Sequence, residues 1–63
     1  MMIHSIKEVP NKDSRIFYVT KSGDGVTIST NDIVPRWNRF VYINDVHYWI
    51  YVSDIIELLC KHY

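Results

Sequence analysis

The sequence predicts an α+β domain dominated by strands, with about five antiparallel strands and one C-terminal helix. The first observation behind this is the aliphatic content, because nine Ile and seven Val stand against two Leu, and Ala is absent. β-Branched residues fit a pleated strand, whereas good helix formers are scarce. The second is a series of short apolar runs separated by Gly, Asn and Asp, which turns favour. The third is an apolar C-terminal segment that opens with Asp54 and Glu57, the spacing of a helix capping box.

The length fits one domain, residues 1–63. A domain of this size buries only about 60% of the surface that its unfolded chain exposes, so its stability margin is small. Cys60 is the one cysteine, so no internal disulfide can stabilise the fold. With 48% hydrophobic and 14% aromatic residues, the chain is expected to rely on a dense core, on self-association as a homodimer, or on both.

Three strands are expected in the first half of the chain, at 2–8, 15–21 and 26–30. The glycine-containing segment 22–25 separates the second from the third as a turn. With these four residues as the loop, Val19 lies opposite Ile28 and Phe17 lies opposite Thr30. This register gathers four apolar side chains on one face, which we expect to be buried: Phe17, Val19, Val26 and Ile28.

The second half of the chain is expected to begin with a connection at 31–36 and to continue as a hairpin with strands at 40–43 and 46–52. Asn44 and Asp45 form the turn, because both tolerate the left-handed conformation of a type I′ turn. Alternation along the two strands gives one mostly aliphatic face and one aromatic face. The aromatic face consists of Phe40, Tyr42, His47, Trp49 and Tyr51.

A helix is expected to begin at Asp54 and to dock on the sheet. At roughly two to three turns it would be marginal alone, so its apolar surface should pack on the strands. That surface comprises Ile55, Ile56, Leu58, Leu59 and Tyr63. Two architectures fit these elements. One is a small SH3-like barrel with closed edges, and the other is an open curled sheet with an edge free to pair with another chain.

The aromatic face of the expected hairpin is one candidate binding surface, with Tyr42, Trp49 and Tyr51 as its contact residues. If exposed, such a face can stack the bases of a single-stranded nucleic acid or anchor a protein interface. The alternative is that this face is core, covered within the monomer or in a dimer, because exposed apolar patches of this size are rare on monomers.

A second candidate is the segment 35–39, which places two arginines around a tryptophan. Trp and Arg dominate the binding energy of many protein interfaces, and Arg pairs with carboxylate or phosphate through a planar fork. The alternative is that the tryptophan fills the core while both arginines are solvated. The two candidates together give the expected partner-binding residues: Arg36, Trp37, Arg39, Tyr42, Trp49 and Tyr51.

The sequence gives little support for catalysis, cofactor binding or metal binding. His47, Cys60 and His62 are chemically suited to bind a metal, but they lack the paired spacing of a structural zinc site. No glycine-rich phosphate loop precedes a helix, and so short a chain has difficulty enclosing a ligand-sized pocket. We therefore expect no catalytic residues, no cofactor and no metal.

Seven basic and seven acidic residues give a formal net charge of zero. This balance argues against a protein held on nucleic acid by phosphate contacts and against an acidic DNA mimic. No apolar run reaches the roughly 18 residues of a membrane span, and residues 1–10 do not have a signal-peptide pattern. We expect a cytoplasmic protein with a reduced thiol and no membrane partner. The lack of Ala with abundant Ile, Tyr, Asn and Lys is typical of AT-rich, compact genomes such as those of phages and mobile elements.

These features favour a non-enzymatic protein-binding module, a small regulator or inhibitor that occupies the surface of a partner protein. One alternative is a nucleic-acid-binding small β-barrel with an aromatic platform and flanking arginines. A second alternative is a self-assembling structural subunit. The sequence leaves open the partner and the face of the sheet that is buried.

Overall fold

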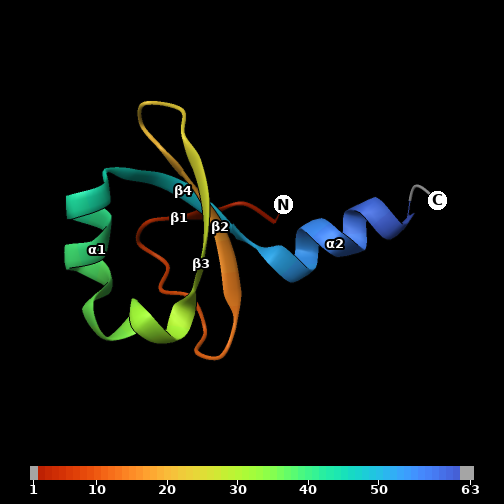
Figure 1. Cartoon of the computed structure of the whole chain (residues 1–63), viewed down its shortest axis with the longest axis horizontal. Helices are drawn as coiled ribbons and strands as arrows, with labels where there is room; N and C mark the ends of the chain where they lie inside the picture. The colour runs from red at the N-terminus through yellow and green to blue at the C-terminus, as the bar shows by residue number, and fades with distance from the viewer. Residues whose placement is uncertain (1, 62–63) are drawn as a thin grey trace.

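The computed structural model describes residues 2–61, and in it a four-stranded sheet separates two helices (Figure 1). The strands are β1 (His4–Ser5), β2 (Arg15–Thr20), β3 (Gly25–Ser29) and β4 (Val46–Tyr51). The helices are α1 (Trp37–Asn44) and α2 (Val52–Lys61), and two 3-10 turns, η1 (Thr30–Asp32) and η2 (Val34–Arg36), lead into α1.

The sheet is antiparallel, with the strand order β1-β4-β2-β3. The predicted α+β class is confirmed. However, the sheet has four strands rather than about five, and it is open rather than closed into a barrel. β1 and β3 form its two edges.

The expected hairpin of 40–43 and 46–52 is wrong in its first strand, because 40–43 lies inside α1. The apolar positions in this segment fit a helix as well as a strand, since Trp37, Phe40 and Val41 have the spacing of one helix face. Trp37 is buried, and Phe40 and Val41 pack against the core. Tertiary packing of this face therefore outweighs the β propensity of the segment.

The expected turn residue Asp45 does take the left-handed conformation, with φ 53°, but it ends a helix rather than closing a hairpin. Its backbone N–H donates to the carbonyl oxygen of Tyr42. β4 follows directly and pairs with β2, so Val46 enters the sheet next to Thr20.

The register of β2 against β3 also differs from the prediction. Phe17 pairs with Thr27 and Val19 pairs with Gly25, three residues away from the expected register. The loop has three residues, 21–23, and is closed by a hydrogen bond of 2.8 Å from the Thr20 N–H to the Asp24 carbonyl oxygen. A turn of this length is possible because Gly23 takes φ 95°, which glycine adopts without steric cost.

The buried face of β2 is also the opposite of the expected one. Ile16 and Tyr18 are buried, whereas Phe17 and Val19 lie half-buried on the other face. Both faces of β2 are apolar, so alternation along the strand could not identify the core side. The core lies between the sheet and the segment that runs from η1 through α1. Its buried hydrophobic residues are Ile16, Tyr18, Ile33, Trp37, Val46 and Trp49.

The other element bounds differ from the predictions by smaller amounts. The strand expected at 2–8 is only His4–Ser5, and the chain then turns, with a hydrogen bond of 3.0 Å from the Glu8 N–H to the Ser5 carbonyl oxygen. The C-terminal helix begins at Val52 rather than at Asp54. It leaves the end of β4 and projects beyond the sheet (Figure 1). His62 and Tyr63 lie outside the described residues.

Across residues 2–61, neither helix is long and apolar enough to cross a membrane.

Candidate functional site

The two tryptophans that we expected to contact a partner are core residues. Trp37 is 4% exposed and Trp49 is 2% exposed. The indole N–H of Trp37 donates to the Ile6 carbonyl oxygen at 2.8 Å, and that of Trp49 donates to the carbonyl oxygens of Ser5 and Glu8 at 3.2 and 3.1 Å. Both side chains therefore hold the N-terminal segment against the core, and a partner cannot reach their rings while the domain is folded.

Tyr51 is half-buried beside them. Its hydroxyl accepts a hydrogen bond of 2.9 Å from the backbone N–H of Asn11, and its ring lies edge-on to that of Trp49 with centroids 4.9 Å apart. The ring of His4 stacks on Trp49 with centroids 4.3 Å apart and also lies edge-on to the ring of Tyr51 at 5.4 Å. Tyr51 thus ties the N-terminal loop to β4 and presents little of its ring to solvent.

The expected aromatic platform does not form as one surface, because its members lie on different elements. Phe40 and Tyr42 belong to α1, while His47, Trp49 and Tyr51 belong to β4. Phe40 packs edge-on to Tyr18 inside the molecule, at a centroid distance of 5.2 Å.

The other three expected contact residues lie on α1 and the turn before it, where Arg36 and Arg39 line one depression and Tyr42 lines another. Arg36 and Arg39 are exposed, and Tyr42 is 86% exposed. Tyr42 and Ile43 each lie about one helical turn after Arg39, so their side chains are its neighbours on the helix surface. Ile43, which the sequence analysis did not single out, is 64% exposed. We call this set the α1 surface: Arg36, Arg39, Tyr42 and Ile43.

A shallow groove runs along the α1 surface between α1 and β3. Its polar lining residues are Asp32, Arg36, Arg39 and Asn44. Its apolar lining residues are Ile28, Ile33, Phe40 and Ile43. Within residues 2–61, neither guanidinium lies within 4.0 Å of a carboxylate, so both arginines keep their hydrogen-bond donors available.

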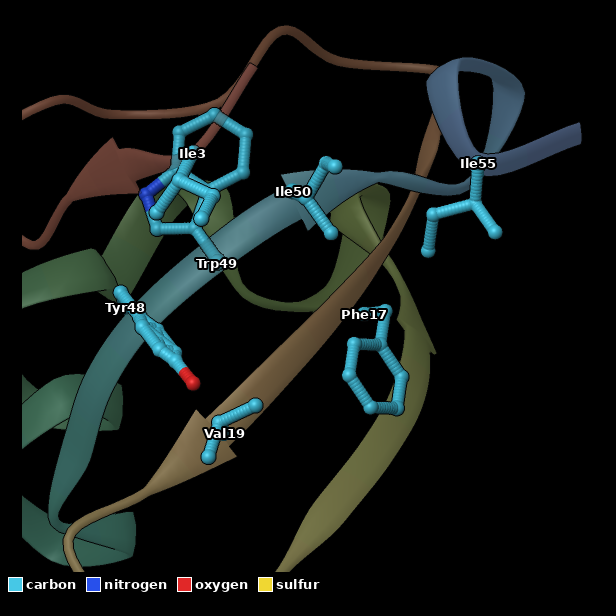
Figure 2. A pocket seen from close by; sticks show the side chains of 7 residues that line it. All are labelled: Ile3, Phe17, Val19, Tyr48, Trp49, Ile50 and Ile55. Carbon is cyan, nitrogen blue, oxygen red and sulfur yellow. The ribbon is translucent and has the colours of Figure 1, made fainter. Parts of the chain in front are cut away.

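A second apolar surface lies on the side of the sheet away from α1. It surrounds a depression of about 210 Å³ (Figure 2). Gly25 of β3 faces the ring of Phe17 there. We call this the sheet face: Ile3, Phe17, Val19, Tyr48, Ile50 and Ile55. This face is not expected from the sequence, because the predicted register places Phe17 and Val19 in the core. The available signal was that β2 and β4 are apolar on both faces, which is typical of strands covered on both sides.

The helix α2 continues this apolar surface instead of covering it. Ile55, in its first turn, points toward the depression that Phe17 and Ile50 line (Figure 2). Further along, Ile56, Leu58 and Leu59 are 55%, 42% and 58% exposed. The predicted apolar side of the helix exists, but beyond its first turns it has no sheet beneath it.

Side chains with potential for metal or acid–base chemistry are dispersed. In the part of the chain that the structure describes, no group of three or more His, Cys, Asp or Glu side chains could hold a metal ion. Cys60 is exposed on α2, while His47 is exposed on β4. His4 instead pairs with Glu8 at 2.7 Å, within the N-terminal turn. His62 lies outside the described residues.

Comparisons of the chain with protein-family models, with curated proteins and with solved structures find no match.

Proposed function

We propose that the chain is a non-enzymatic protein-binding module, a small regulator or inhibitor that acts by occupying the surface of a partner protein. The α1 surface is the proposed contact. The observation that carries this proposal is the 86% exposure of Tyr42 one helical turn after Arg39, which, like Arg36, has no carboxylate partner among residues 2–61. Tyr and Arg are enriched where protein interfaces gain most of their binding energy.

These residues lie on or next to the short helix α1, which is packed on the core. This position favours a role in partner binding over simple exposure to solvent. The inner side of α1 is packed on the core, because Trp37 is buried there and Phe40 and Val41 pack against it. Because these residues lie on a helix that is already formed, binding need not also order a loop, and the conformational entropy lost there is mainly that of the exposed side chains. The groove beside α1 combines apolar side chains with two arginines and one aspartate, which suits an apolar partner side chain next to a carboxylate that an arginine can pair with.

A role in nucleic-acid binding has less support. That alternative depended on a continuous platform of Tyr42, Trp49 and Tyr51, and the three residues do not share a surface. A single exposed tyrosine with two arginines can contact an acidic protein as readily as a phosphate.

The experiment that tests the proposal is site-specific photo-crosslinking. A photoreactive phenylalanine analogue replaces Tyr42 in the full chain, which is exposed to a lysate of its host with and without nuclease. The same analogue at Arg15, an exposed residue on β2, is the matched control. A protein that crosslinks from position 42 but not from position 15, and that survives nuclease treatment, is then purified for direct binding measurements.

With that purified protein, Arg39→Ala and Tyr42→Ala are each expected to weaken binding tenfold or more. Arg15→Ala should leave the affinity unchanged. Truncation of an exposed side chain leaves the core intact, so circular dichroism should show the same fold in all three variants. Unchanged affinity in both α1 variants would contradict the proposed contact, and crosslinking to nucleic acid alone would contradict the protein-binding function.

A further inference from the structure

Two apolar surfaces of the described residues have no partner within the chain, and they adjoin each other. The sheet face has no helix over it, because α1 and the 3-10 turns lie on the other side of the sheet (Figure 1). The helix α2 has no sheet under most of its length. At 100° per residue, its apolar side chains fall on one side of the helix: Val52, Ile55, Ile56, Leu58 and Leu59.

The dimensions of the chain show the same lack of cover. The radius of gyration of the Cα atoms is 11.7 Å, whereas a compact domain of this length has about 10.6 Å. The accessible surface is 4720 Å², whereas a compact monomer of this mass exposes about 4,200 Å². The chain is therefore larger and more exposed than its length requires, and Figure 1 shows that α2 is the part that extends away.

We propose that a second copy of the chain covers these surfaces, in a twofold dimer in which α2 of each copy lies across the sheet face of the other. The two surfaces are complementary in kind: an apolar helix side that lacks a sheet, and an apolar sheet face that lacks a helix. A twofold arrangement makes both contacts at once, because the same pair of surfaces meets twice.

The orientation of α2 supports this arrangement. Ile55 lies in the first turn of α2 and lines the depression together with Phe17 and Ile50, so the apolar side of the helix opens toward the same side as the sheet face (Figure 2). The polar side of α2 carries an ion pair between Lys61 and Glu57 at 3.4 Å. When the apolar side lies on a partner sheet, this pair remains in solvent, so no charge is buried without a partner.

Charge and area also favour a second copy as the occupant. The net charge is zero, so two copies do not repel each other over long range. The exposed parts of the sheet face and of α2 amount to roughly 600 Å² per copy, or roughly 1,200 Å² in the dimer, at the lower edge of stable specific interfaces. This area predicts a dimer in a concentration-dependent equilibrium with its monomer. The inference does not depend on the proposed function, because the α1 surface remains free in such a dimer.

The first test is sedimentation equilibrium of the full chain. The wild type is expected to dimerise, and Leu59→Lys is expected to raise the dissociation constant tenfold or more. Glu57→Lys, on the polar side of the same helix, is the matched control and should change the constant by less than about threefold. Should Leu59→Lys fail to fold, as judged by circular dichroism, Ile3→Lys tests the sheet side, because Ile3 is 54% exposed at the edge of the depression.

The second test establishes which surfaces meet. A nitroxide spin label on the exposed Cys60 of one copy is mixed with ¹⁵N-labelled chain that carries Cys60→Ser. The dimer proposed here requires line broadening at the backbone amides of Val19 and Tyr48 in the ¹⁵N-labelled chain, and no broadening on α1. Three results would overturn it: a monomer up to millimolar concentration, a dimer that Leu59→Lys and Ile3→Lys leave intact, or broadening confined to α1.

Discussion

The indole N–H of Trp37 donates to the carbonyl oxygen of Ile6 over 2.8 Å, which joins α1 to the N-terminal segment across 31 residues of sequence. Trp49 donates two further hydrogen bonds to the same segment, and β1 ends at Ser5. Beyond that residue, hydrogen bonds from the two indoles take the place of strand pairing. A segment with only two residues in the sheet thus keeps its place through two buried side chains.

Trp37→Phe should therefore destabilise the domain, because it removes this donor and leaves space in the core. We expect a loss of about 1–3 kcal/mol in the free energy of unfolding, measured with urea. The amide of Glu8, which bonds the Ser5 carbonyl oxygen in the same turn, should also exchange faster with solvent. Tyr42→Phe, an exposed aromatic change on the same helix, is the control. Equal stability of Trp37→Phe and wild type would show that the Ile6 bond contributes nothing.

Thr30 makes a second cross-link of this kind. It is fully buried, and its hydroxyl both donates to the Ser14 carbonyl oxygen at 3.1 Å and accepts from the Ser14 N–H at 3.0 Å. Thr30→Val keeps the shape but leaves that N–H without a partner, so we expect a loss of about 1–3 kcal/mol. Thr30→Ser keeps the hydroxyl and loses one buried methyl, at a cost of about 0.8 kcal/mol. In urea, Thr30→Ser should have a higher free energy of unfolding than Thr30→Val. The reverse order would contradict the role of the hydroxyl.

Asp45 lies at the junction of α1 and β4 in the left-handed region, with φ 53°. For most L-residues this conformation costs about 1–2 kcal/mol, so Asp45→Val should destabilise by about that amount. Asp45→Gly should be neutral or stabilising, since glycine adopts this φ freely. The ion pair of Asp45 with Lys21, at 3.5 Å, is more than 60% exposed on both sides and contributes under about 1 kcal/mol. Lys21→Met removes that pair alone and serves as the control, and a larger loss in Lys21→Met than in Asp45→Val would contradict this account.

The parts of the fold that could be predicted from the sequence are those set by local chemistry. β2, β3 and β4 lie within one or two residues of their predicted bounds, because β-branched runs between turn residues have few other conformations. Of the two residues expected in the left-handed conformation, Asn44 and Asp45, only Asp45 adopts it, and it ends a helix instead of closing a hairpin.

The parts that could not be predicted depend on tertiary packing. The apolar residues of 37–43 satisfy a strand period and a helix period together, and burial of Trp37 against Trp49 selects the helix. Likewise, β2 has Ile16 and Tyr18 on one face and Phe17 and Val19 on the other, so the sequence cannot say which pair is core. The exposed contact residues differ from the expected set for the same reason. Arg36, Arg39 and Tyr42 lie on the surface, whereas Trp37, Trp49 and most of Tyr51 are needed inside.

Gly25 provides a test of the sheet face, because a Cβ atom at this position would overlap the ring of Phe17. The ring lies on a half-exposed surface and can turn aside, so we expect Gly25→Ala to cost about 1 kcal/mol, at the lower end of overpacking effects. In Phe17→Ala the ring is gone, and adding Gly25→Ala should then cost nothing. A double-mutant cycle in urea should therefore give a coupling of about 1 kcal/mol.

Gly23 is the matched control for this cycle. A Cβ atom there meets nothing within 4 Å, but its φ of 95° makes any L-residue strained. Gly23→Ala should thus also cost about 1 kcal/mol, through backbone strain, and this cost should be the same with or without Phe17. Coupling of Phe17 to Gly23 as strong as that to Gly25 would show that the loop responds as a whole. Coupling to Gly25 alone would show that the Phe17 ring packs over β3 in the folded chain.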